Sequence, residues 1–163
     1  MTAGGPGAPG ADAEASAADR AWLARAIDLS RRCPPSRTAY AVGAIIVAAD
    51  GTVLATGYTR ETSPHDHAEE AALAKLGPAD TGLGGATLYS SLEPCRFRAS
   101  RPRPCAELII EVGLRRVAIA WLEPPLLAAG GGAALLRAAG VTVVEIPGLA
   151  ARARAVNAAV LGE

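Results

Sequence analysis

Residues 86–95 read Ala-Thr-Leu-Tyr-Ser-Ser-Leu-Glu-Pro-Cys, a short apolar strand followed at once by a proline and a cysteine. A helical pattern at 67–75 precedes this strand, and after an arginine-rich loop a second helix is expected from Pro104 to about Val112. Alternating strands and helices of this kind favour an α/β layered sheet with parallel strands. Cys95 is therefore expected just beyond the end of a strand in such a sheet.

The other expected elements extend this pattern in both directions. They are a helix at about 20–32 capped by Asp19, strands at 40–48 and 52–59 joined by the Asp50-Gly51 turn, a strand at 116–121, a helix at 133–139, a strand at 141–146 and a helix at 149–160. The first two strands form an antiparallel hairpin, so the sheet is expected to be mixed. Residues 1–18 are mainly Ala, Gly and Pro, which predicts a disordered tail before a single domain at 19–163.

Composition narrows the class of protein. Lys plus Arg and Asp plus Glu both number 16, so no overall charge would draw the chain to nucleic acid or to a membrane. No stretch is long and apolar enough for a transmembrane span, and the N-terminus lacks the pattern of a signal peptide. Three cysteines are too few for a disulfide scaffold. We therefore expect a cytoplasmic protein, where thiols stay reduced and can bind metal.

Four residues predict a catalytic metal site. His67, Cys95 and Cys105 offer one imidazole and two thiolates, the ligand types that zinc prefers, and three ligands leave the fourth tetrahedral position open to water. Glu69 lies two residues after the histidine. A His-x-Glu segment with a Pro-Cys pair is the signature of zinc deaminases, in which the glutamate acts as acid and base and does not bind the metal. One Zn²⁺ per subunit is expected.

The predicted helices explain why these residues would suit the chemistry. His67, Glu69 and Cys105 each lie in the first turn of a predicted helix, where the helix dipole favours anions, so Cys105 is expected to lose its proton more readily than a free cysteine. Zinc lowers the pKa of a bound water toward neutrality, and Glu69 would pass its proton to a substrate nitrogen and then to the leaving amine. The predicted reaction is hydrolytic deamination of a ring.

Simpler interpretations exist for the same residues. Cys33 is expected to be a small apolar core residue, and Glu69 could merely stabilise a helix N-terminus. A purely structural zinc site would need a fourth protein ligand. The remaining candidates are His65 and Cys33, and neither lies at a natural spacing from the other three.

Taken together, these segments resemble the cytidine-deaminase-like superfamily of zinc deaminases, and most of all the pyrimidine deaminase of riboflavin biosynthesis. Segment 86–95 is similar to that family's strand leading to the metal ligand, 42–47 to its first strand, and 113–117 to its next strand. The nine residues between the two cysteines also match this type better than the cytidylate type, which has two. The resemblance covers about 20–160. It implies a three-layer α/β/α sandwich around a five-stranded sheet, and a homodimer or homotetramer.

The differences from the family leave the substrate open. An asparagine usually precedes the first strand, but residues 36–41 read Ser-Arg-Thr-Ala-Tyr-Ala. The later Asp-Pro-Asn-Pro is Glu-Pro-Pro-Leu at 123–126, and the loop between the cysteines carries arginines where the family has histidines. No reductase domain follows Glu163, so we expect a deaminase alone.

Candidate substrate contacts come from two sources. The loop 96–103 holds a quarter of all Lys and Arg residues, and guanidinium groups bind phosphate well, so a phosphorylated ribosyl-pyrimidine would fit; a solvated loop or a subunit contact is the alternative. Aromatic rings could stack on the substrate and hydroxyls could bind its edge. The candidates are Ser36, Thr38, Tyr40, His65, Phe97, Arg98, Arg101, Arg103 and, for stacking only, Trp121.

The sequence therefore predicts an enzyme that deaminates a small aminopyrimidine, with the phosphoribosylated diaminopyrimidinone of riboflavin synthesis as the main hypothesis. A cytosine nucleoside or nucleotide deaminase and a deaminase of a modified pyrimidine are the alternatives among enzymes. A nucleic-acid-binding or editing module is a further alternative. It is disfavoured by the balanced charge and by the small number of aromatic residues, two Trp, three Tyr and one Phe.

Overall fold

The computed structural model describes residues 14–78, 80, 83–127 and 130–163, and these contain one five-stranded sheet in the order β2-β1-β3-β4-β5. The strands are β1 (Gly43–Val47), β2 (Val53–Tyr58), β3 (Thr87–Ser90), β4 (Arg116–Ile119) and β5 (Thr142–Glu145). β1 pairs antiparallel with β2 and with β3, whereas β3, β4 and β5 run parallel. The prediction of a mixed sheet that opens with an antiparallel hairpin is confirmed.

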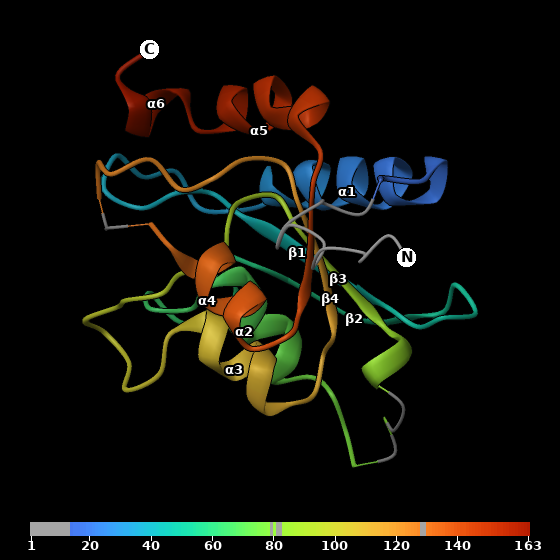
Figure 1. Cartoon of the computed structure of the whole chain (residues 1–163). Coiled ribbons are helices and arrows are strands. Elements are labelled where there is room, and N and C mark those ends of the chain that lie inside the picture. The colour runs from blue at the N-terminus through green and yellow to red at the C-terminus, as the bar shows by residue number, and fades with distance from the viewer. Residues whose placement is uncertain (1–13, 79, 81–82, 128–129) are drawn as a thin grey trace, which may run out of the picture.

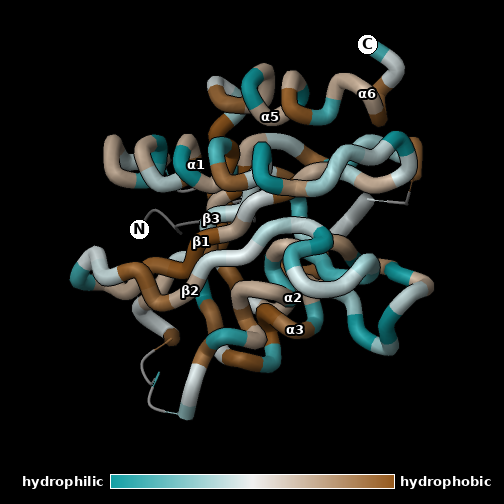
Figure 2. The backbone as a smooth tube through the Cα atoms, turned by 180° about the vertical axis from the view of Figure 1, so that it is seen from behind, coloured by the Kyte–Doolittle hydropathy of each residue, from teal (hydrophilic) through white to brown (hydrophobic). Residues whose placement is uncertain are grey.

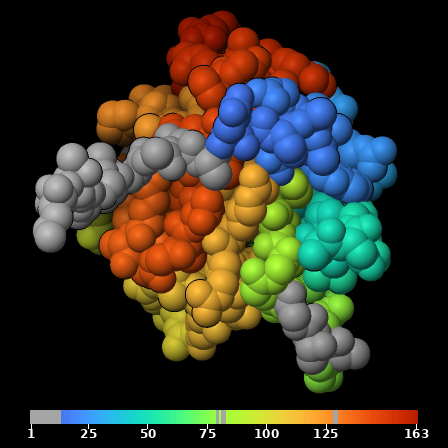
Figure 3. Space-filling view, turned by 45° about the vertical axis from the view of Figure 1, so that its right-hand side comes forward, coloured from blue at the N-terminus to red at the C-terminus, as the bar shows by residue number. Residues whose placement is uncertain are grey.

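Helices cover both faces of the sheet (Figure 1). The helices are α1 (Ala17–Ser30), α2 (Ala68–Leu73), α3 (Cys105–Glu111), α4 (Gly132–Ala138), α5 (Ala150–Val156) and α6 (Ala158–Leu161), with short 3-10 turns at Leu83–Gly85 and Pro147–Leu149. α1 and α5 lie on one face, and α2, α3 and α4 lie on the other. Figure 3 shows the C-terminal helices beside α1. The three-layer α/β/α sandwich is confirmed.

The core fills the space between these layers. Every residue of β1 and β3 is buried, as expected for central strands covered on both faces. Hydrophobic stretches gather along the strands, whereas the loops at one side of the molecule are mostly hydrophilic (Figure 2). Within the described residues, no helix combines the length and the apolar character needed to cross a bilayer.

The first helix begins earlier than predicted. It starts at Ala17, and its N-cap is Ser16, whose hydroxyl accepts a hydrogen bond from the Asp19 N–H at 3.0 Å. The Asp19 carboxylate accepts in return from the Ser16 N–H at 2.9 Å, which makes a capping box. Asp19 is therefore the third helical residue and not the cap. Residues 1–13 of the predicted tail lie outside the described residues.

A glycine brings α2 close to the sheet. A Cβ atom at Gly57 in β2 would lie 2.4 Å from the carbonyl oxygen of Ala68, so no other residue fits without moving the helix. Ala68 and Ala72 are fully buried on the helix face at this contact. The close packing fixes the position of the N-terminus of α2, from which the metal site is built.

Candidate metal centre

Three predicted ligands meet at the ends of three elements. His67 is the N-cap of α2, Cys95 follows β3, and Cys105 is the first residue of α3. Their ligand atoms all lie within 4.8 Å of one another. The Nδ1 atom of His67 is 3.4 Å from the Cys95 Sγ and 3.5 Å from the Cys105 Sγ. Among the described residues, this is the cluster of His, Cys and acidic side chains with the geometry to hold a metal ion.

The spacing of these atoms fits zinc. Tetrahedral zinc with bonds of about 2.0–2.1 Å to nitrogen and about 2.3 Å to sulfur separates neighbouring donors by about 3.5–3.8 Å. The two observed nitrogen–sulfur separations, 3.4 and 3.5 Å, are therefore close to those of a tetrahedral zinc site. Two buried thiols and one imidazole are also the donor chemistry that zinc prefers.

The two thiols differ in how easily they lose a proton. The Cys105 thiol and its N–H, which lies 3.2 Å from the Cys95 Sγ, stabilise the Cys95 thiolate and lower the pKa of Cys95 to about 4. The pKa of Cys105 is raised, because this thiol is fully buried beside a sulfur that is already charged. The N–H at the start of α3 thus favours the thiolate of Cys95, because it points at that sulfur. The expected low pKa of Cys105 stays a prediction for the metal-bound form, in which both sulfurs would be thiolates.

Glu69 lies in the first turn of α2 and is 4% exposed. Its Oε1 atom is 2.6 Å from the hydroxyl of Ser90, the last residue of β3. Burial raises the pKa of Glu69, and the Ser90 hydrogen bond opposes this only in part. No Arg or Lys pairs with this carboxyl among the described residues. It is thus a buried acid whose charged form no arginine or lysine stabilises.

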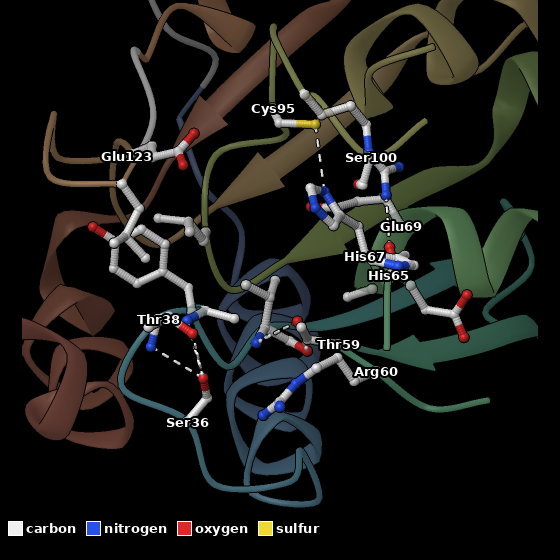
Figure 4. A pocket seen from close by; sticks show the side chains of 18 of the residues that line it. Ser36, Thr38, Thr59, Arg60, His65, His67, Glu69, Cys95, Ser100 and Glu123 are labelled. Atoms are coloured by element: carbon white, nitrogen blue, oxygen red, sulfur yellow. Dashed lines mark hydrogen bonds between the residues drawn. The ribbon is translucent and has the colours of Figure 1, made fainter. Parts of the chain in front are cut away.

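A cavity of about 490 Å³ opens beside the metal centre. Figure 4 shows His67, Glu69 and Cys95 at one end, and Ser36, Thr38 and Arg60 at the other. Pockets of this size suit small organic ligands. Cys105 is not among the lining residues and is fully buried.

The sequence of this chain matches a known family along most of the same region. Residues 16–121 match the family described as the cytidine and deoxycytidylate deaminase zinc-binding region. The chain belongs to this deaminase family. The matched region contains His67, Cys95 and Cys105, so the prediction of zinc as the metal is confirmed.

Individual relatives are similar to it as well. The chain is 37% identical over 127 residues to a diaminohydroxyphosphoribosylamino-pyrimidine deaminase of Schizosaccharomyces pombe, an alignment that covers 76% of this chain and 31% of that protein. A solved structure of Acinetobacter baumannii RibD has a TM-score of 0.72 at 30% identity, covering 88% of this chain and 39% of that one. The Aspergillus oryzae Rib2 deaminase (C-terminal deletion mutant) has a TM-score of 0.70 at 25% identity, covering 89% and 99%. The chain thus spans about a third of the S. pombe protein.

The arginine-rich loop of this deaminase-family chain is largely neutralised. The buried side chain of Arg98 donates to the Glu70 carboxylate at 3.2 Å and to the His65 carbonyl at 2.7 Å. Arg101 lies 3.4 Å from Asp66 and 3.6 Å from Glu70, outside the cavity lining. Arg103 pairs with Glu111 on the exposed side of α3 and does not line the cavity. Of the three predicted phosphate ligands, only Arg98 reaches the cavity, and it arrives already paired with an acid.

The other predicted substrate contacts divide into two groups. Ser36, Thr38, Tyr40, His65 and Phe97 all line the cavity. Trp121 does not: it is buried, and it packs edge-on against Tyr40 with ring centroids 6.0 Å apart. The Tyr40 hydroxyl is buried without a hydrogen-bond partner among the described residues, so it is available to a ligand.

The sequence analysis did not identify three charged residues that line the cavity, Glu93, Glu123 and Arg60. Glu123 lines the cavity, and burial, with the Cys95 charge, raises its pKa to about 7. The buried Glu93 accepts hydrogen bonds from the Glu123 N–H at 2.9 Å and the Ala133 N–H at 2.8 Å, so it holds the loop after β4 against α4. Arg60 lines the far end. Glu93 lies within segment 86–95, which resembles the family, but its two hydrogen-bond partners are far away in the sequence. Glu123 and Arg60 belong to no recognisable sequence motif.

Proposed function

We propose that this chain catalyses the zinc-dependent hydrolytic deamination of an aminopyrimidine, with release of ammonia. The observation that carries the proposal is the buried Glu69 carboxyl, which lines one cavity together with His67 and Cys95 and is paired with no cation. The deaminase activity of the similar S. pombe protein supports it. The catalytic unit is residues 19–163, with His67, Cys95 and Cys105 as metal ligands and Glu69 as the catalytic acid and base.

The three ligands would hold the ion and leave one position facing the cavity. When bound, zinc makes water a strong nucleophile at neutral pH by lowering its pKa. His67 and Cys95 line the cavity, whereas Cys105 is fully buried, so substrate can approach from one side only. The open position and the cavity would therefore coincide.

Glu69 moves the protons in this proposal. A raised pKa suits a group that must gain a proton and return it at neutral pH. The Ser90 hydroxyl fixes Oε1 of Glu69 and can donate to the charged form or accept from the protonated form, because Ser90 Oγ also lies 2.8 Å from the Leu92 carbonyl. Glu69 would take a proton from the attacking water and pass it to a ring nitrogen as the bond between water oxygen and the adjacent carbon forms. It would then take the proton of the new hydroxyl group and give it to the amino group, so that the C–N bond breaks, ammonia leaves and a carbonyl remains.

We propose the phosphoribosylated diaminopyrimidinone of riboflavin biosynthesis as the substrate. The name of the S. pombe relative supports this choice, and the cavity is large enough for a small organic ligand. A homodimer or homotetramer and a cytoplasmic location complete the proposal. The location follows from the two cysteine ligands, which need reduced thiols.

Metal content and ammonia release test the proposal together. Purified protein is expected to contain one zinc per chain, and in a coupled ammonia assay to prefer the phosphoribosylated diaminopyrimidinone over cytidine, dCMP and cytosine. Removing the metal with a chelator should abolish turnover, and adding zinc should restore it. If only cytidine or dCMP released ammonia, that compound would be the substrate and the riboflavin precursor would not. Full activity in metal-free protein would refute the mechanism.

A further inference from the structure

The far end of the cavity is polar and lies away from the metal centre. Figure 4 shows Ser36 and Thr38 there, with the Arg60 side chain reaching toward them. A hydrogen bond from the Arg60 Nη2 to the carbonyl of Pro34 ties the guanidinium to the segment that leads into Ser36. The acids Asp66, Glu69, Glu93 and Glu123 also line the cavity, as do the metal ligands His67 and Cys95. The Asp66 carboxylate is occupied by the N–H groups of Thr62 and Ser63 and by Arg101, so it does not pair with Arg60.

Arg60 differs from the other arginine of the cavity in its partners. Arg98 is paired with Glu70. Arg60 has no carboxylate within ion-pair distance among the described residues, and this is what distinguishes the two. The Nε atom of Arg60, like that of Arg98, is buried without a hydrogen-bond partner. A guanidinium with an unused, desolvated donor binds a phosphate group well, because it can offer more than one hydrogen bond and a full charge.

The backbone holds Arg60 in an unusual conformation. Its φ of 59° is the single positive value at a non-glycine among the described residues. The Arg60 N–H donates to the Asp66 carbonyl at 2.9 Å, and the Asp66 carboxylate accepts from the N–H groups of Thr62 at 2.9 Å and Ser63 at 2.8 Å. The loop is therefore closed on itself. Strained backbone that the surrounding structure enforces is common where a side chain must be held for a ligand.

Two hydroxyl groups line the same cavity as this guanidinium. The Ser36 Oγ accepts from the N–H groups of Thr38 and Ala39, both at 3.1 Å, which fixes its position and leaves its own proton free to donate. The Thr38 Oγ1 lies 3.3 Å from it. Both side chains line the cavity. They supply neutral donors to complement the charge of Arg60.

We propose that Arg60, together with the hydroxyls of Ser36 and Thr38, binds the phosphate ester of the substrate at the end of the cavity far from the metal. This inference rests on the proposed function, in that it assigns the part of the substrate away from the reacting ring. It also replaces the arginine-rich loop as the phosphate-binding element, since Arg98, Arg101 and Arg103 are engaged by acids.

The test compares Arg60→Gly with Arg152→Ala on two substrates. Glycine adopts a positive φ without strain, so this variant removes the guanidinium and keeps the turn. Arg152 lies on α5, where its exposed side chain pairs with Asp28 outside the cavity. Arg60→Gly is expected to raise KM for the phosphoribosylated diaminopyrimidinone roughly 10- to 100-fold, and to change KM for the dephosphorylated ribosyl compound less than about 3-fold. Arg152→Ala should change neither.

A binding measurement separates this inference from the proposed function. Ribose 5-phosphate, titrated calorimetrically into the zinc-loaded protein, is expected to bind wild type and Arg152→Ala equally, and to bind Arg60→Gly roughly 10-fold more weakly or not at all. Arg60→Lys, which keeps the charge, should fall between them. Equal binding by wild type and Arg60→Gly would overturn the assignment even if the enzyme is active. Weak binding by Arg60→Gly alone supports it even if another pyrimidine proves to be the substrate.

Discussion

Two adjacent residues of β3, Tyr89 and Ser90, each hold a buried carboxyl group, but on opposite faces of the sheet. The Tyr89 hydroxyl donates to Asp19 on α1 at 2.8 Å, whereas the Ser90 hydroxyl meets Glu69 on α2 at 2.6 Å. Side chains alternate across a strand, so these pairs lie in different layers. Both carboxyl groups are less than 5% exposed.

A cation accounts for the difference between the two carboxyl groups. Arg116 donates two hydrogen bonds of 2.8 Å to Asp19, one to each oxygen, and these hold the pKa of Asp19 well below its usual range. Glu69 has no such partner, and burial raises its pKa. With a fixed cation, a buried acid remains charged and contributes to stability. Without one, it can exchange a proton, which is what catalysis needs.

Glu69→Gln should break the catalytic half of this comparison. Glutamine keeps the shape but cannot carry the proton, so kcat is expected to fall roughly 10²- to 10⁴-fold. Zinc content and the thermal midpoint should stay within error of wild type, because the side chain is neither a metal ligand nor part of an ion pair. Steady-state kinetics and metal analysis check this. A variant that keeps most of its turnover would place the proton carrier elsewhere.

Asp19→Asn should give the opposite result. The neutral amide leaves the partly buried Arg116 unpaired and weakens the capping box at Ser16, so unfolding is expected to cost about 2–3 kcal/mol less. This loss of stability is smaller than for a fully buried ion pair, because the Arg116 side chain retains some contact with solvent. Urea denaturation measures it, and kcat at a temperature where both proteins are folded should be unchanged. A large fall in kcat would mean that the two faces of the sheet are coupled.

The same carboxyl predicts how stability depends on pH. The pKa of Asp19 in the folded protein lies well below that of an aspartate in the unfolded chain. Its contribution to stability is therefore fully present above the unfolded pKa, and it is lost progressively as pH falls from there through the folded pKa. Between about pH 6 and about pH 3, wild type should lose about 1 kcal/mol more stability than Asp19→Asn. Denaturant titrations at several pH values test this, and parallel curves for the two proteins would contradict it.

The smallest effects should come from the two hydroxyl groups themselves. Ser90→Ala removes the group that positions Glu69 and should lower kcat roughly 3- to 10-fold with little change in stability. Tyr89→Phe should lower stability by about 0.5–1 kcal/mol with little change in kcat, because Arg116 still holds Asp19. Comparing the two variants shows whether the face of β3 on which a hydroxyl lies determines if its loss affects kcat or stability. Identical phenotypes would argue against it.

The metal centre could be predicted from sequence because its residues stand where regular elements begin or end. His67 precedes α2, Cys95 follows β3 and Cys105 begins α3, so the α/β pattern alone brings them toward one edge of the sheet. The spacing of ligand types then identifies zinc. The first helix was misplaced by three residues because Ser16 and Asp19 are both good caps, and only the capping-box geometry distinguishes them.

The far end of the cavity could not be predicted in the same way. Its residues lie in loops, and their partners are fixed by tertiary contacts that no local pattern encodes. In the sequence, Arg98 and Arg101 indicated a phosphate site. In the structure, Arg98 pairs with Glu70 of α2 and Arg101 pairs with Asp66 of the preceding loop, so both charges are already neutralised. Arg60 gave no signal, because a positive φ at an arginine has no counterpart in sequence.

The metal ligands are also far apart along the chain. His67 comes before β3, and the two cysteines come after it, so the three donors converge only once the central strand lies between its neighbours. Metal uptake is then linked to completion of the tertiary structure. Cobalt bound in place of zinc absorbs visible light when thiolates ligate it tetrahedrally. This absorption would therefore report refolding directly, without a label attached to the protein.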